Sequence, residues 1–288
     1  MAPPPASLWA LSFFLALLVT LFVAATLRLL SILPHVRFQP KPLCKQPPVA
    51  TRILIILGSG GHTHEMFYLL RDLDTSKYTH RTYVVSSGDA FSAQRAVEFE
   101  QALEQRETVK FESKEPESRN PDVFLNGTGI EKQQHAVRTP HLGPENYNIA
   151  IVPRARKIHQ SLFTTPFTSL HTLLSSFPVL LSSPPLLPDQ LPQTPYEAAA
   201  RDLPDLVITN GPATAVILVL ASLILKFFNI RGAQSRGKMK SVYVESFARV
   251  KTLSLSGRLL VRVVDRFLVQ WEELEGKAGR AEYCGILV

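Results

Sequence analysis

A glycine-rich turn at residues 58–62 points most directly to chemistry. Gly58, Gly60 and Gly61 follow the apolar run RILIIL and precede a helical pattern. Glycine permits backbone conformations that other residues resist, and a turn leading into a helix presents backbone N–H groups to an anion. A phosphate is therefore the expected ligand, and a tight turn without a ligand is the alternative. The turn lacks the third glycine of a dinucleotide fingerprint and the Gly-Lys-Ser/Thr of a Walker loop.

His62 closes this turn, and His64 and Glu65 follow it. A histidine at the end of a strand has the chemistry of a general base near neutral pH. A solvated or helix-capping histidine is the alternative. Two histidines spaced i, i+2 without a third ligand do not make a zinc site, so we expect no metal here.

Polar residues also follow three other apolar runs. Arg154 and Arg156 come after YNIAIV, Asn210 and Gly211 after DLVIT, and Glu245 to Arg249 (ESFAR) after KSVYV. In open α/β sheets, ligands bind at the carboxyl ends of the strands, so these residues should share one rim with the glycine turn. Solvated arginines and ordinary turn geometry are the simpler interpretations.

Short apolar strands that alternate with helices must position these residues. Strands are predicted at 52–57, 81–86, 147–152, 205–209, 240–244 and 266–270, and helices at 63–73, 90–105, 158–174, 213–228 and within 250–264. This alternation predicts an α/β domain at 52–288, with a parallel sheet and helices on both faces. The polar stretch near 113–146 and the Ser- and Pro-rich stretch near 175–197 are predicted to be insertions.

The N-terminal segment predicts a transmembrane helix. Residues 8–27 read LWALSFFLALLVTLFVAATL, and twenty helical residues span about 30 Å, the thickness of a bilayer core. A cleaved signal peptide is the alternative, but no Lys or Arg precedes the run. We therefore expect a single-pass anchor at 1–33 and a Pro-rich basic spacer at 34–51. The apolar stretch at 213–228 is short for a second span and is predicted to be a buried helix.

Charge and cysteine content narrow the cellular setting. Basic residues follow the apolar run and no acidic residue appears before Glu65, so the positive-inside rule places the N-terminus in the lumen and the body in the cytosol. The net charge of +7 suits anionic lipids, phosphorylated ligands or nucleic acid. Cys44 and Cys284 lie at opposite ends of the chain, which argues against a disulfide framework.

Taken in order, these pieces resemble a known family. The motifs are ILIILGSGGHTHEM, YVVSSGD, IVPRARKIHQS, DLVITNGPAT and SVYVESFARV, followed by LSGRLL and DRFLVQWEEL. With the N-terminal anchor, they resemble the membrane-anchoring subunits of the eukaryotic UDP-N-acetylglucosamine transferase. That enzyme acts in the dolichol-linked oligosaccharide pathway of asparagine-linked glycosylation.

The resemblance implies a Rossmann-like acceptor-side half of a two-chain GT-B glycosyltransferase. A soluble catalytic subunit would bind UDP-GlcNAc, and the pair would add the second GlcNAc to GlcNAc-diphosphodolichol at the endoplasmic reticulum membrane. The glycine turn and the rim residues would then bind the acceptor, with His62 as base or phosphate contact. No cofactor and no nucleic acid is implied, and this subunit alone would be inactive.

The resemblance also implies that the C-terminal tail, residues 282–288, holds the partner. Its contact residues would be Tyr283, Ile286, Leu287 and Val288. Two alternatives remain: a membrane-bound nucleotide-cofactor reductase, and a scaffold without a substrate site. A substrate site predicts that Gly61→Val blocks close backbone approach, whereas a scaffold tolerates this change. A cytosolic body predicts that the sequon at Asn126 stays unmodified.

Overall fold

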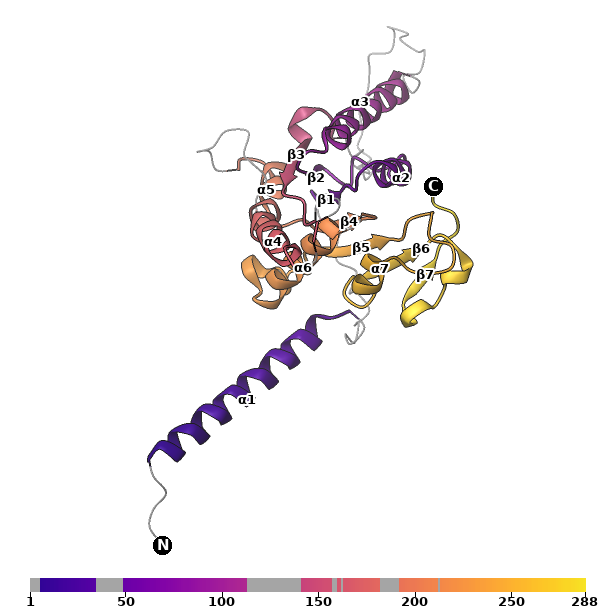
Figure 1. Cartoon of the computed structure of the whole chain (residues 1–288). Coiled ribbons are helices and arrows are strands. Elements are labelled where there is room, and N and C mark those ends of the chain that lie inside the picture. The colour runs from indigo at the N-terminus through magenta and orange to yellow at the C-terminus, as the bar shows by residue number, and fades with distance from the viewer. Residues whose placement is uncertain are drawn as a thin grey trace, which may run out of the picture.

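The computed structural model describes residues 6–34, 49–112, 141–156, 160–161, 163–181, 192–211 and 213–288. A long helix, α1 (Ala6–Ile32), stands away from an α/β body (Figure 1). The body is built on a seven-stranded sheet in the order β3-β2-β1-β4-β5-β6-β7, and every neighbouring pair is parallel. The strands are β1 (Arg52–Ile56), β2 (His80–Ser86), β3 (Tyr147–Val152), β4 (Leu206–Thr209), β5 (Lys240–Val244), β6 (Arg266–Val269) and β7 (Ala281–Tyr283). The predicted parallel sheet is confirmed.

Helices cover both faces of this sheet. They are α2 (Gly61–Leu69), α3 (Ala90–Glu112), α4 (Thr165–Leu181), α5 (Pro195–Arg201), α6 (Ala213–Phe227) and α7 (Leu255–Leu260), with 3-10 turns at Pro144–Asn146, Ile230–Gly232, Glu272–Leu274 and Lys277–Gly279. The helices α2 and α3 pack on one face, and α4 and α6 pack on the other.

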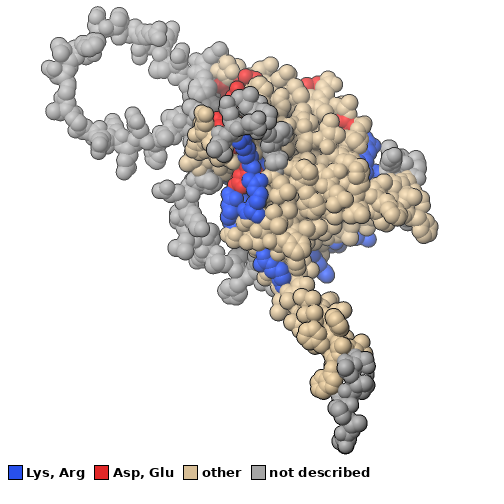
Figure 2. Space-filling model, turned by 90° about the vertical axis from the view of Figure 1, so that its left-hand side faces the viewer, with Lys and Arg blue, Asp and Glu red and all other residues tan. Residues whose placement is uncertain are grey.

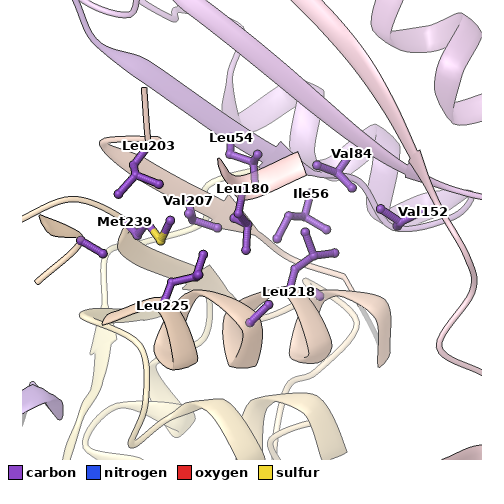
Figure 3. Close-up of a cluster of buried hydrophobic side chains, with 13 residues drawn as sticks. Leu54, Ile56, Val84, Val152, Leu180, Leu203, Val207, Leu218, Leu225 and Met239 are labelled. Carbon is purple, nitrogen blue, oxygen red and sulfur yellow. The ribbon is translucent and has the colours of Figure 1, made fainter. Parts of the chain in front are cut away.

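Alternation along β1 builds the two halves of the core. Leu54 and Ile56 face the α4–α6 side, whereas Ile53 and Ile55 face the α2–α3 side. All four side chains are at most 1% exposed, as expected for a parallel strand covered on both faces. On the α4–α6 side they meet side chains of neighbouring strands and of both helices, labelled in Figure 3 as Val84, Val207, Leu180, Leu218 and Leu225.

Three elements differ from the sequence-based prediction. The helix expected at 158–174 begins at Thr165 and continues to Leu181, so residues 175–181 are helical and not part of a flexible insertion. The Ser176 hydroxyl donates to the carbonyl of Thr172 (2.6 Å), so it bonds within the helix and does not break it. The helix α5 and the strand β7 were not predicted, and α5 begins inside the stretch predicted to be the second insertion. The sequon at Asn126, most of the spacer and the central parts of both insertions lie outside the described residues.

The helix α1 is long and apolar enough to cross a membrane. Its apolar segment, Trp9–Ile32, has 24 residues, and a window of 18 residues within it has a mean hydropathy of 2.5. Near its C-terminal end, Arg28 donates hydrogen bonds to the carbonyls of Phe227 (2.9 Å) and Lys226 (3.2 Å), which end α6. A guanidinium there satisfies free carbonyls at the negative end of the α6 dipole, so it joins the anchor to the body. The helix α6 is itself buried along one side, as predicted.

Candidate functional site

The glycine turn between β1 and α2 contains two different requirements for glycine. Gly60 has φ of 59°, in the left-handed region that other residues avoid. At Gly58, an added Cβ would lie 2.6 Å from the Cβ of His62 and 3.3 Å from the Cα of Gly211. At Gly61, an added Cβ would have no neighbour within 4 Å. Among the protein's own atoms, close contact therefore requires glycine at position 58 and not at position 61. The close approach predicted at Gly61 is that of a ligand to the backbone.

Side chains from α2 and α3 hold this turn in place. The hydroxyl of Thr63 donates to the carbonyl of Gly58, and the hydroxyl of Ser92 donates to the same oxygen (3.1 Å). Ser92 also bonds Asp89 (2.8 Å), which precedes α3. Sequence reasoning missed these residues, because contacts between α2 and α3 are not visible in a local pattern.

A cavity of about 700 Å³ opens at the carboxyl ends of the strands. It adjoins β1 and β4, where the strand order reverses direction, which is the usual ligand position in open α/β sheets. Seven of the nine predicted catalytic and acceptor-site residues line it: Gly58, His62, Arg154, Arg156, Asn210, Gly211 and Glu245. Gly60 and Gly61 shape the turn but do not line the cavity.

His62 lies in a polar cluster that joins three strand ends. Its side chain is about one-third exposed, and its Nδ1 lies 3.9 Å from Glu65 Oε2. That nitrogen is buried and has no hydrogen-bond partner. Asn210 donates to the backbone carbonyl of His62 (2.7 Å), and the hydroxyl of Ser246 donates to Glu65 Oε1 (3.0 Å). Glu65 therefore orients the groups around His62, a role that the sequence did not reveal.

Glu245 lines the cavity, but its carboxylate is already bound by protein groups. Oε2 accepts from the backbone N–H and hydroxyl of Ser254 (3.0 and 3.1 Å), and Oε1 accepts from the backbone N–H of Ser246 (3.3 Å). Burial raises the pKa of the neighbouring Tyr243, and the charge of Glu245 raises it further. Glu245 therefore organises the 246–256 loop at the cavity wall.

Three arginines border the cavity and give it a positive character. Arg154 donates to the carbonyl of Ser87 (3.0 Å), and Arg156 donates to the carbonyl of Gln160 (3.3 Å). Arg249, which follows β5, is exposed and lines the cavity on the β5 side, whereas the other two arginines follow β3. Its place agrees with the prediction that residues 245–249 share this rim. Residues 157–159, which follow Arg156, lie outside the described part of the chain.

Two helices also direct their N-termini to this cavity. His62 belongs to the first turn of α2, and Ala213, Thr214 and Ala215 begin α6. The free N–H groups and the positive ends of both dipoles favour an anion. Together with the arginines, they make the cavity suitable for a phosphate or diphosphate.

The C-terminal tail connects to the same cavity wall. Tyr283 lies in β7 at the sheet edge, and the backbone N–H of Leu287 donates to Gln270 Oε1 (3.2 Å). The Nε2 of Gln270 donates to the carbonyl of Glu245 (3.1 Å). Ile286 remains 60% exposed. The predicted tail is thus partly a sheet strand, with an exposed apolar side chain beyond it.

The fold and the cavity define a class: α/β proteins with an apolar N-terminal helix and an arginine-bordered cavity at the carboxyl edge of a parallel sheet. Residues 53–121 and 125–287 match the family model described as oligosaccharide biosynthesis protein Alg14 like. This chain therefore belongs to the Alg14-like family.

Curated relatives cover nearly the same region. The chain is 39% identical over 259 residues to the UDP-N-acetylglucosamine transferase subunit alg14 of Aspergillus fumigatus, covering 77% of this chain and 100% of that protein. It is 36% identical over 244 residues to the subunit of the same name from Schizosaccharomyces pombe, covering 84% and 86%. The human subunit is 32% identical over 242 residues, covering 84% and 85%. These relatives confirm the resemblance to a family of glycosyltransferase subunits, and none supports a reductase.

Two solved structures align with most of this chain at low sequence identity. MurG of Acinetobacter baumannii aligns with a TM-score of 0.41 and 12% identity, covering 81% of this chain and 45% of MurG. The UDP complex of Arabidopsis thaliana UGT89C1 aligns with a TM-score of 0.36 and 13% identity, covering 83% and 53%. The chain thus spans about half the length of each.

Proposed function

We propose that this chain is the membrane-bound, acceptor-side subunit of a two-chain UDP-GlcNAc transferase. The pair adds the second GlcNAc to GlcNAc-diphosphodolichol on the cytosolic face of the endoplasmic reticulum. The body is one Rossmann-like half of a GT-B enzyme, and a soluble catalytic subunit supplies the donor half. The observation that carries the proposal is the arginine-bordered cavity, found in a chain of the Alg14-like family.

The cavity suits the diphosphate of the acceptor. Arg154, Arg156 and Arg249 supply positive charge from opposite walls, and α2 and α6 supply N-terminal N–H groups. Guanidinium–phosphate hydrogen bonds are among the stronger polar interactions, and helix N-termini add to them. We therefore assign the diphosphate to the part of the cavity between these arginines and the helix N-termini. The sugar is assigned to the part next to His62.

His62 is the proposed base. The acceptor hydroxyl attacks the anomeric carbon of UDP-GlcNAc, the bond to UDP breaks, and UDP leaves as the hydroxyl proton passes to His62. The imidazole lines the cavity, and Glu65 lies 3.9 Å from its buried nitrogen. That carboxylate can stabilise the imidazolium as the proton is transferred.

The anchor and the tail complete the assembly. In this proposal α1 spans the membrane with its N-terminus in the lumen, because the basic residues follow the apolar run. The soluble subunit binds at the C-terminal tail, where Ile286 is exposed and Leu287 and Val288 are partly exposed. The cavity then lies on the subunit that is anchored in the membrane.

Transfer assays on the intact two-chain complex in membranes test this proposal. His62→Ala should lower kcat by about 100-fold as the loss of a general base. Arg249→Gln should raise the KM for the lipid acceptor by about tenfold, as expected for one lost charge-assisted hydrogen bond. Neither change should reduce recovery of the catalytic subunit on the membrane. The exposed Lys277→Gln is the matched control. Wild-type kinetics in both cavity variants would show that the subunit is only a scaffold.

A further inference from the structure

The helix α4 carries large apolar side chains on its outer side. Phe163, just before the helix, and Phe167, Leu170 and Leu174 are 91%, 76%, 53% and 58% exposed. Their spacing of four, three and four residues places them along one side of a helix. We call these four residues the α4 stripe.

The inner side of α4 combines core leucines with small hydroxyl residues. Leu180 is buried, and Leu173 and Phe177 pack against the core. Thr172 and Ser176 are both 0% exposed, so they turn inward while phenylalanines turn outward. A helix that faces water normally has the opposite arrangement, with polar side chains outside. An exposed contiguous apolar surface of this kind marks an interaction site.

Hydroxyl groups of α4 hold the loop that carries the cavity arginines. The hydroxyls of Thr168 and Ser169 donate to the carbonyl of Ala155 at 2.8 and 3.3 Å. Ala155 lies between Arg154 and Arg156, which line the cavity. The stripe therefore begins at the rim of the candidate acceptor site.

The other end of α4 meets the base of the anchor. The guanidinium of Arg231, which follows α6, donates to the carbonyl of Leu181 at the end of α4. Arg28 of α1 binds the last two carbonyls of α6, which lie only a few residues before Arg231 in the chain. Phe228, 66% exposed, adds an apolar side chain at this end. With 17 residues, α4 spans about 25 Å between the anchor and the cavity rim.

The surface on this side of the molecule is broad and uncharged. Figure 2 shows it above the base of α1, with Lys and Arg side chains at its edges. Apolar side chains bordered by cations match the interface of a bilayer that contains anionic lipids.

We propose that α4 lies in the membrane interface, with the α4 stripe inserted among the lipids. This inference rests on the proposed function and deepens it. With α4 in the interface, the cavity opens at the lipid surface, where a lipid diphosphate is found. The anchor argues for lipid as the occupant, since it holds this side of the body at the membrane. Even a weak contact between α4 and the lipid is then occupied, because tethering by α1 raises the effective concentration of the membrane surface near α4.

Fluorescence quenching in liposomes tests the contact without any transferase activity. The full chain, with Cys44→Ser and Cys284→Ser, receives one environment-sensitive fluorophore through Phe167→Cys. The control label enters through Phe91→Cys, since Phe91 is 52% exposed on α3. In phosphatidylcholine–phosphatidylinositol vesicles with shallow spin-labelled lipid, quenching at 167 should exceed quenching at 91 by at least threefold. Equal quenching, or protection at 167 only when the catalytic subunit is added, would overturn the proposal.

A second measurement separates lipid access from catalysis. In the two-chain complex, Phe167→Asp with Leu170→Asp should lower transfer to a long-chain acceptor in liposomes by tenfold or more. Transfer to a short-chain, water-soluble acceptor should stay within twofold of wild type, and Phe91→Asp should change neither rate. Equal loss with both acceptors would count against the membrane contact. If the chain labelled at position 167 shows lipid quenching but the wild-type two-chain complex shows no transfer, the proposed function fails and this inference stands.

Discussion

At the scale of single residues, the requirement for glycine comes from neighbours that the sequence does not display. The pattern Gly58-Ser59-Gly60-Gly61 indicated a turn, but not which glycine is irreplaceable. Gly60 is fixed by its backbone angle and Gly58 by its contacts with His62 and Gly211. Gly211 lies 153 residues away, and the parallel pairing of β1 with β4 brings the two together.

Gly58→Ala should destabilise the protein more than Gly61→Ala. The Cβ at position 58 forces backbone to move, at a cost of about 1–3 kcal/mol typical of overpacking. At position 61 the space is open and the change should cost less than about 1 kcal/mol. Thermal unfolding of the full chain in detergent micelles measures both. Equal midpoints for the two variants would refute the steric assignment.

His80 should make the body sensitive to acid. Burial, together with the charges of Arg52 and Arg81, lowers the pKa of its imidazole to about 3. Below the ordinary pKa of about 6.5, the unfolded chain binds a proton that the folded chain rejects, so stability falls as pH falls from 6.5 towards 3. This loss is about 2 kcal/mol at pH 5. His80→Gln should flatten the dependence on pH, whereas the exposed His64→Gln should not. An unchanged slope of unfolding free energy against pH in His80→Gln would refute this assignment.

At the scale of elements, apolar runs were sufficient to predict the strands β1 to β6. Each is a short apolar segment, and β1, β2 and β4 are almost entirely buried, whereas β3 at the sheet edge is mostly half-exposed. The strand β7 has only three residues, AEY, and no pattern of its own, because pairing with β6 defines it. The end of α4 was misjudged because serine and proline are frequent in loops, whereas here Ser176 bonds within the helix.

Gln270 should couple the tail to the cavity wall. Its side chain is 1% exposed and bonds both Leu287 and Glu245, so Gln270→Leu leaves two backbone groups without this partner. A buried unpaired group costs about 1–3 kcal/mol. We expect faster hydrogen exchange of the amides at 285–288 and weaker recovery of the catalytic subunit. The exposed Glu273→Gln is the control, and unchanged exchange would contradict the coupling.

At the scale of the whole molecule, sequence predicted the parts of the protein but not how they are joined. The apolar run predicted an anchor, and strand ends predicted one rim of site residues, seven of which do line a single cavity. The contact of Arg28 with α6 joins residues 199 positions apart, and no local pattern encodes it.

Assembly with the catalytic subunit should depend on the exposed end of the tail. Deleting residues 283–288 would also shorten β7, because Tyr283 pairs with Val269, so a loss of binding would have two explanations. Ile286→Asp avoids this, since Ile286 is 60% exposed and a charge there leaves the sheet intact. In an interface core, an unpaired carboxylate costs several kcal/mol, so recovery of the partner on membranes should fall at least tenfold. Unfolding of the isolated subunit should be unchanged, which separates assembly from folding. The exposed Glu275→Gln is the control, and full recovery of the partner by Ile286→Asp would place its binding surface elsewhere.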